Sequence, residues 1–162
     1  MDTAYKTTLE LDKVLNRAVQ LCACQETKEM MQALEPAPTI EDERYDLTQT
    51  NAINALLIKN GSPRFGSVRE VRRIVAHARK GGILSMGELL EIAATLRNFS
   101  GLSQWYGLSE HEMLPTDDLF FALAPQPVLE KQISESIISP EEMADTASVT
   151  LHDLRRKIRQ TE

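Results

Sequence analysis

The sequence has few of the residues on which redox chemistry, metal binding or membrane insertion depends. Of its 162 residues, two are cysteine, three are histidine and one is tryptophan, and aromatic residues make up 5%. No apolar run approaches the roughly 20 residues that cross a bilayer. The start, "MDTAYKTTLELDK", lacks the basic and apolar segments of a secretion signal. We therefore expect a cytoplasmic protein with no membrane partner.

The cysteines and histidines do not form a recognisable site. Cys22 and Cys24 lie two apart in a helical pattern, so their side chains point in different directions and are expected to act as small hydrophobic groups in a reducing compartment. His77, His111 and His152 lack the i, i+4 spacing of a zinc-binding helix. No GxxxxGK[ST] loop is present. We predict no catalytic, cofactor-binding or metal-binding residue in these 162 positions.

Basic residues are concentrated in two stripes, although the chain as a whole is acidic. Its net charge is −6, so it does not match nucleic acid overall and any basic surface must be local. One interpretation is that each stripe is a solvated helix face, and the other is that it contacts phosphates of DNA or ribosomal RNA. The candidate nucleic-acid contacts are Arg64, Arg69, Arg72, Arg73 and Arg79 in the first stripe, and Arg155, Arg156, Lys157 and Arg159 in the second.

Apolar periodicity predicts an all-α protein built as an antiparallel helical bundle with short connections. Helices are expected over 9–34, with a looser stretch at "CQET", then over 39–60, 68–79, 85–106, 119–123 and 128–138. Capping boxes begin the helices at Thr39 and Ser85, and Asn60-Gly61 and Gly81-Gly82 end two others. No sheet is predicted, although the isoleucines of 133–138 also suit a short extended piece.

A last helix begins at Ser148, which is a suitable N-cap, and places Leu151, Leu154 and Ile158 on one face. The sequence stops after about three turns, with no glycine or proline to end the helix. We predict a helical core over residues 1–147 and an outward-pointing helix over 148–162.

Three segments together resemble a known family. "LELDKVLNRAVQLCACQETKEMMQALEPAPTIEDE", "GSPRFGSVREVRRIVAHARKGGILSMGELLEIAATLRN" and "MADTASVTLHDLRRKIRQ" are similar, in the same order, to segments of the second bacterial MutS paralogue. The sequence departs from the family pattern at "CQET", where a serine-and-glycine turn is usual, and at Arg64-Phe65, which replaces a more apolar pair.

The resemblance implies a function that spacing alone does not. Proteins of this family are large homodimers with an N-terminal helical core, lever helices, a clamp, a MutS-type ATPase that uses ATP and Mg, and usually a C-terminal Smr nuclease domain. They are associated with suppressing recombination on branched or mismatched DNA and with splitting collided ribosomes. The resemblance implies that this region is the N-terminal core, that residues 148–162 begin a lever toward the clamp, and that the ATPase and nuclease residues lie beyond Glu162. The region would then be a non-catalytic coupler that reaches DNA or the ribosome through the full-length protein.

Two other classes of function remain open from the residues alone. A helical bundle can build an enzyme site from inward charged side chains, and a deep charged pocket would favour a small all-helical enzyme. A free-standing helical scaffold is the other alternative, and ATPase sequence in the same reading frame would exclude it.

Overall fold

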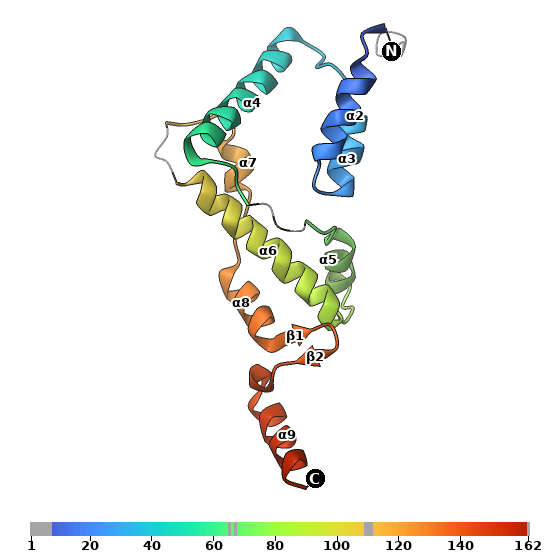
Figure 1. Cartoon of the computed structure of the whole chain (residues 1–162), viewed down its shortest axis with the longest axis vertical. Helices are drawn as coiled ribbons and strands as arrows, with labels where there is room; N and C mark the ends of the chain where they lie inside the picture. The colour runs from blue at the N-terminus through green and yellow to red at the C-terminus, as the bar shows by residue number, and fades with distance from the viewer. Residues whose placement is uncertain (1–7, 65, 67, 109–111, 162) are drawn as a thin grey trace.

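The computed structural model describes residues 8–64, 66, 68–108 and 112–161, and the all-α class predicted from the sequence is confirmed. The helices pack in pairs along an elongated molecule, with the N-terminal hairpin at one end and the last helix at the other (Figure 1). In chain order the elements are α2 (Leu11–Leu21), α3 (Gln25–Gln32), α4 (Ile40–Asn60), α5 (Arg72–Arg79), α6 (Met86–Tyr106), α7 (Asp117–Phe121), α8 (Pro127–Ser136), β1 (Ile137–Ser139), β2 (Glu142–Met143), the 3-10 turn η1 (Asp145–Ala147) and α9 (Val149–Thr161).

Helices α2 and α3 form a hairpin, and the chain turns at the cysteines. Cys22 ends α2 in an extended conformation and Cys24 occupies the N-cap of α3, so the prediction that both lie within a helical pattern is wrong. The Cys22 thiol donates to the Ala18 carbonyl at 3.4 Å, which leaves the turn closed by local contacts. Both cysteines are free thiols. Neither α2 nor α3 contains a buried residue.

Helix α4 begins where the sequence predicts. The Thr39 hydroxyl accepts a hydrogen bond from the Asp42 amide at 3.1 Å, which satisfies one of the otherwise unpaired N–H groups of the first turn. The helix ends at Gly61, whose φ of 72° is readily adopted only by glycine. Near that end, Leu56 is buried against Trp105 and Tyr106 of α6, with Phe120 of α7 beside them.

Helix α5 is shorter than predicted. It begins at Arg72, so Val68 to Val71 precede it in irregular structure and Arg69 is not on the helix. No side chain caps this N-terminus, and β-branched valines have low helix propensity, which together explain the late start. Gly81 follows with a φ of 84°, as the predicted glycine terminator requires.

Helix α6 is the central element and carries both buried clusters. It begins with the predicted capping box, in which the Ser85 hydroxyl accepts from the Glu88 amide and Glu88 accepts from the Ser85 amide at 2.7 Å. Its C-terminal half packs in the cluster around Leu56. Its N-terminal half packs on α8, where Ala93 lies against Ile133 and Ile137. The two clusters place α4 and α8 along the same helix (Figure 1).

The segment between α8 and α9 contains a small antiparallel sheet, so the prediction of no sheet is wrong for residues 137–143. β1 pairs with β2, and Ile137 of β1 is buried in the second cluster while Ile138 is exposed. The alternating burial of the two isoleucines is what an extended strand produces and a helix does not. The chain reverses here and enters η1 and α9, which extends away from the rest of the molecule (Figure 1).

Candidate nucleic-acid interface

The first basic stripe is divided between paired and unpaired arginines. Arg72 forms an ion pair with Glu26 of α3 at 3.2 Å, and Arg73 lies 4.0 Å from Glu70. The other three, Arg64, Arg69 and Arg79, are exposed and make no ion pair with any residue that the structure describes. The available positive charge of this region is therefore spread over Arg64, Arg69 and Arg79 instead of lying along one helix face.

In the second stripe, two arginines bind the same carboxylate. Arg155 Nη1 donates to Asp145 Oδ1 at 2.5 Å and to the Met143 carbonyl at 2.9 Å, and Arg159 Nη2 donates to Asp145 Oδ2 at 2.7 Å. Hydrogen bonds from Arg155 first and Arg159 second hold the pKa of Asp145 below its ordinary value. We call Asp145, Arg155 and Arg159 the α9 anchor, because they fix the second and third turns of α9 to η1 and β2.

The remaining cations of α9 are exposed and differ from Arg155 and Arg159 in their pairing. Arg156 and Lys157 are exposed, and their side chains make no ion pair within the part of the chain that the structure describes. Two arginines of the second stripe are therefore paired with Asp145, and its other two cations face solvent.

The predicted N-cap of α9 is confirmed. The Ser148 hydroxyl accepts from the Leu151 amide at 3.1 Å. Along α9, Leu151 is half-buried, while Leu154 and Ile158 are 53% and 58% exposed. The apolar stripe is covered at its base and open along its outer turns.

The described histidines and cysteines do not form a metal site. Within the described ranges, no three His, Cys, Asp or Glu side chains are grouped so that they could hold a metal ion. His77 packs its ring close to Gly82, where an added Cβ would lie 2.2 Å from Nε2, and His152 lies 3.7 Å from Asp153. His111 is outside the described residues.

One polar group of the core has a perturbed pKa. The Tyr106 hydroxyl donates to Asp117 Oδ1 at 2.6 Å and lies 2.9 Å from the Thr116 hydroxyl, which is 1% exposed. Burial and the hydrogen bond to Asp117 raise the pKa of Tyr106. Because the Tyr106 ring also stacks on Phe120 with a centroid distance of 3.8 Å, this group serves to join α6 to α7.

Sequence reasoning did not find Asp145. The residue lies in "MADTASVTLHDLRRKIRQ", but neither charge nor spacing indicates that two arginines 10 and 14 positions later converge on it. The chain bends at Ser148, between η1 and α9, and this bend brings the three side chains together.

These observations define a class: an all-α segment whose last helix projects from a fixed base. None of the helices in the described part of the chain is long and apolar enough to span a bilayer. Neither a protein-family model nor a solved structure matches the chain.

Curated relatives specify the class further. A protein named Endonuclease MutS2 from Ruminiclostridium cellulolyticum is 30% identical over 162 residues, which is 99% of this chain and 20% of that protein. Proteins of the same name from Clostridium beijerinckii and Lachnospira eligens are 29% and 30% identical over 94% and 96% of this chain. The chain spans about a fifth of the length of these relatives. The chain is similar to about a fifth of these proteins, and the resemblance predicted from the sequence is confirmed.

Proposed function

We propose that this chain is a non-catalytic helical coupler within a longer MutS2-type protein. Residues 1–147 form the core and residues 148–162 begin a lever that connects an ATPase domain to a clamp. The longer protein would be a homodimer that binds ATP and Mg outside this segment. It would act on branched or mismatched DNA to suppress recombination, or on collided ribosomes, and a Smr nuclease domain would follow.

The observation that carries the proposal is the α9 anchor. A lever transmits displacement only if its base is held, and two charge-assisted hydrogen bonds to one carboxylate restrict both translation and rotation of α9. The Met143 carbonyl adds a third contact from β2. Close packing of α6 on α8 then connects this base to the rest of the core.

The test of coupling is a substitution that frees the base of α9. In the longer protein, Asp145→Asn should reduce the stimulation of ATP hydrolysis by branched DNA or ribosomes and leave the unstimulated rate unchanged. Glu142→Gln is the matched control, because Glu142 is an exposed acid of neighbouring β2 and is not one of the three side chains of the anchor. Equal stimulation in wild type and Asp145→Asn would refute the coupling role. Calorimetry on residues 1–162 should detect no stoichiometric ATP site, and a tight site would also refute it.

A second candidate function is direct contact with nucleic acid through the unpaired cations. It is supported by the exposure of Arg64, Arg69, Arg79, Arg156 and Lys157, since a cation already paired with a carboxylate releases fewer counterions on binding phosphate.

This candidate is tested by the salt dependence of binding. Replacing Arg156 and Lys157 by Gln should flatten the plot of log affinity against log salt by about 0.9 for each phosphate of duplex DNA that the variant no longer neutralises. The matched control is Arg72→Gln, which removes a cation that is already paired with Glu26. An unchanged slope in the Arg156 and Lys157 variant would refute the contact on α9.

A further inference from the structure

The end of α4 carries a dipeptide with a reactivity of its own. Asn60 is the last residue of the helix and Gly61 follows it, and none of the other four asparagines of the chain precedes a glycine. In an Asn-Gly pair, the backbone nitrogen of the glycine can attack the side-chain carbonyl carbon of the asparagine, because glycine has no Cβ to obstruct the approach. The product of this attack is a five-membered succinimide ring.

The attacking nitrogen is not engaged in the structure. The residues that follow α2, α3, α5 and α6 each donate a backbone hydrogen bond into the last turn of their helix. The Gly61 amide makes no such bond with any residue that the structure describes. Gly61 is exposed, and apart from its chain neighbours no atom lies within 4 Å of the place where a Cβ would be. Solvent and base therefore reach this amide.

Trp105 of α6 holds both residues of the pair. Asn60 Nδ2 donates to the Trp105 carbonyl at 3.2 Å, and Trp105 Nε1 donates to the Gly61 carbonyl at 2.8 Å. Trp105 is itself 6% exposed in the first cluster. Closing a succinimide ring rotates the Asn60 side chain and the backbone bond that leads to Gly61, which breaks these hydrogen bonds. We call Asn60, Gly61 and Trp105 the Trp105 clasp.

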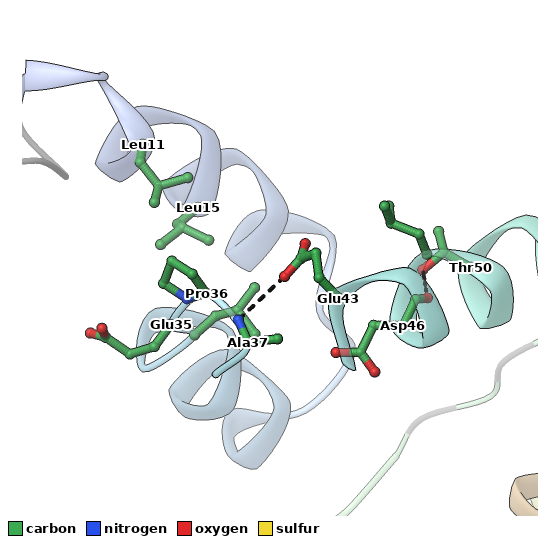
Figure 2. A pocket seen from close by; sticks show the side chains of 10 residues that line it. Leu11, Leu15, Glu35, Pro36, Ala37, Glu43, Asp46 and Thr50 are labelled. Carbon is green, nitrogen blue, oxygen red and sulfur yellow. Dashed lines mark hydrogen bonds between the residues drawn. The ribbon is translucent and has the colours of Figure 1, made fainter. Parts of the chain in front are cut away.

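The clasp lies where α4 is attached to α6. Leu56, one turn before Asn60, is the only buried residue of α4. The first turns of α4 face the loop after the hairpin and border a cleft there, with Glu43 Oε2 accepting a hydrogen bond from the Ala37 amide at 3.2 Å (Figure 2). The attachment of α4 to α6 therefore depends on the last turns of α4.

We propose that Asn60 is a deamidation site protected by the Trp105 clasp, and that it reacts when α4 separates from α6. In the open state the Gly61 nitrogen bonds to Asn60 Cγ and the Cγ–Nδ2 bond breaks. The side-chain nitrogen takes up the proton of the Gly61 amide and leaves as ammonia. Water then opens the ring at either carbonyl carbon, which leaves aspartate or isoaspartate at position 60.

The modification prevents the clasp from closing again. A carboxylate cannot donate a hydrogen bond to the Trp105 carbonyl, and its charge lies at the C-terminal end of α4, where the helix dipole disfavours an anion. Isoaspartate adds one carbon to the main chain and displaces the Gly61 carbonyl from Trp105 Nε1. Separation of α4 from α6 thus becomes permanent in the modified chains. The proposal goes beyond the coupler role and does not depend on it.

The test is the rate of deamidation at Asn60, measured by peptide mapping of residues 1–162 during incubation at mildly alkaline pH. Mass spectrometry detects the exchange of ammonia for water, and enzymatic methylation of isoaspartate identifies the second product. The native chain should react about tenfold or more slowly than the chain unfolded in guanidinium chloride, which is the protection that two hydrogen bonds of ordinary strength provide. The other four asparagines are internal controls and should stay unmodified over the same period.

Two variants distinguish the clasp from stability in general. Trp105→Phe removes the Nε1 donor and keeps an aromatic ring, whereas Leu56→Ala weakens the same cluster and leaves the three clasp residues unchanged. Urea unfolding followed by circular dichroism gives the unfolded fraction of each variant, and hence the rate that global unfolding alone produces. Trp105→Phe should react about two- to tenfold faster than wild type and faster than its unfolded fraction accounts for. Leu56→Ala should show only the increase that its unfolded fraction accounts for.

The effect of the product is measured with Asn60→Asp. This variant should unfold at a lower urea concentration than Asn51→Asp, which is the matched control because it adds the same charge at an exposed position in the middle of α4. Equal midpoints for the two variants would refute the loosening of the joint.

Other results would overturn the protection or the site. Native and unfolded chains that react at the same rate refute protection by the clasp. A Trp105→Phe rate fully explained by global unfolding refutes it as well. An Asn60 that stays unmodified in the unfolded chain would refute the deamidation site itself.

Discussion

The hydroxyl group of Tyr106 offers a sharp test of how α6 is joined to α7. Its single proton is donated to Asp117 Oδ1 at 2.6 Å, so the Thr116 hydroxyl at 2.9 Å must donate to Tyr106. Tyr106→Phe keeps the ring and its stacking on Phe120, so apolar burial is preserved. It leaves the Thr116 hydroxyl, which is 1% exposed, without this acceptor.

The expected loss follows from that unpaired hydroxyl. Leaving a buried donor unsatisfied lowers the free energy of unfolding by about 1–3 kcal/mol. For a chain of this size, each kcal/mol corresponds to a decrease of about 2–4 °C in Tm. Replacing both partners by apolar groups of the same shape is nearly neutral. The double variant Tyr106→Phe/Thr116→Val should therefore be more stable than Tyr106→Phe alone.

Urea unfolding measures these differences directly. Trp105 is the single tryptophan and lies in the same cluster, with its ring centroid 6.1 Å from that of Phe120, so its fluorescence reports on this region. Far-UV circular dichroism should give the same transition midpoint if unfolding is two-state. A double variant less stable than Tyr106→Phe would refute the reasoning.

The pH dependence gives an independent check on the same hydroxyl. The pKa of Tyr106 is raised in the folded protein, chiefly by burial. Its contribution to stability is therefore complete below the pKa of an unfolded tyrosine and is lost as the pH rises through the higher folded value. Tyr106→Phe should remove this part of the alkaline loss of stability, and an unchanged alkaline profile would contradict the assignment.

Three further predictions concern the anchor, a turn and the core. Asp145→Asn should accelerate amide hydrogen exchange over 149–161, because the anchor needs the ionised carboxylate. Wild type should show the same acceleration as the pH falls through the lowered pKa of Asp145. Exchange that does not change would contradict the anchor. Gly81→Ala should lower the free energy of unfolding by about 1–2 kcal/mol because Gly81 has a φ of 84°; no neighbouring atom blocks a Cβ there, so the backbone conformation is the cause. Gly101→Ala inside α6 should raise the free energy of unfolding by up to about 1 kcal/mol. Equal effects of the two substitutions in thermal melts would exclude this account. Leu56→Ala should cost about 2–5 kcal/mol, since Leu56 is 4% exposed, and a loss below about 1 kcal/mol would show that the first cluster does not hold α4 to α6.

Features that depend on neighbouring residues were predicted well from the sequence. The starts at Thr39, Ser85 and Ser148 are each determined by a side chain that caps an amide three residues later. Gly61 and Gly81 end helices because their positive φ angles exclude most other residues. Such interactions can be read from the sequence because both partners lie within one turn.

Features that depend on other elements were predicted incompletely: the isoleucines of 133–138 also suited a short extended piece, but their pairing with β2 was not predicted. The strand at Ile137 forms because the chain pairs with β2 and buries that side chain against α6 and α8. The convergence of Arg155 on Asp145 requires the bend at Ser148 that separates η1 from α9. For the basic stripes, the sequence identified the cations but not which are paired, because the partners Glu26 and Asp145 belong to other elements.

The N-terminal hairpin has a consequence for how this region can vary. Both buried clusters are built from residues at Ile53 or later, and the hairpin is tied to α5 by the Glu26–Arg72 pair, whose side chains are 39% and 80% exposed. Such a pair contributes little to stability. Stability of the fold therefore constrains the residue types in α2 and α3 only weakly. Their side chains can instead vary to fit a neighbouring domain or molecule that contacts the hairpin.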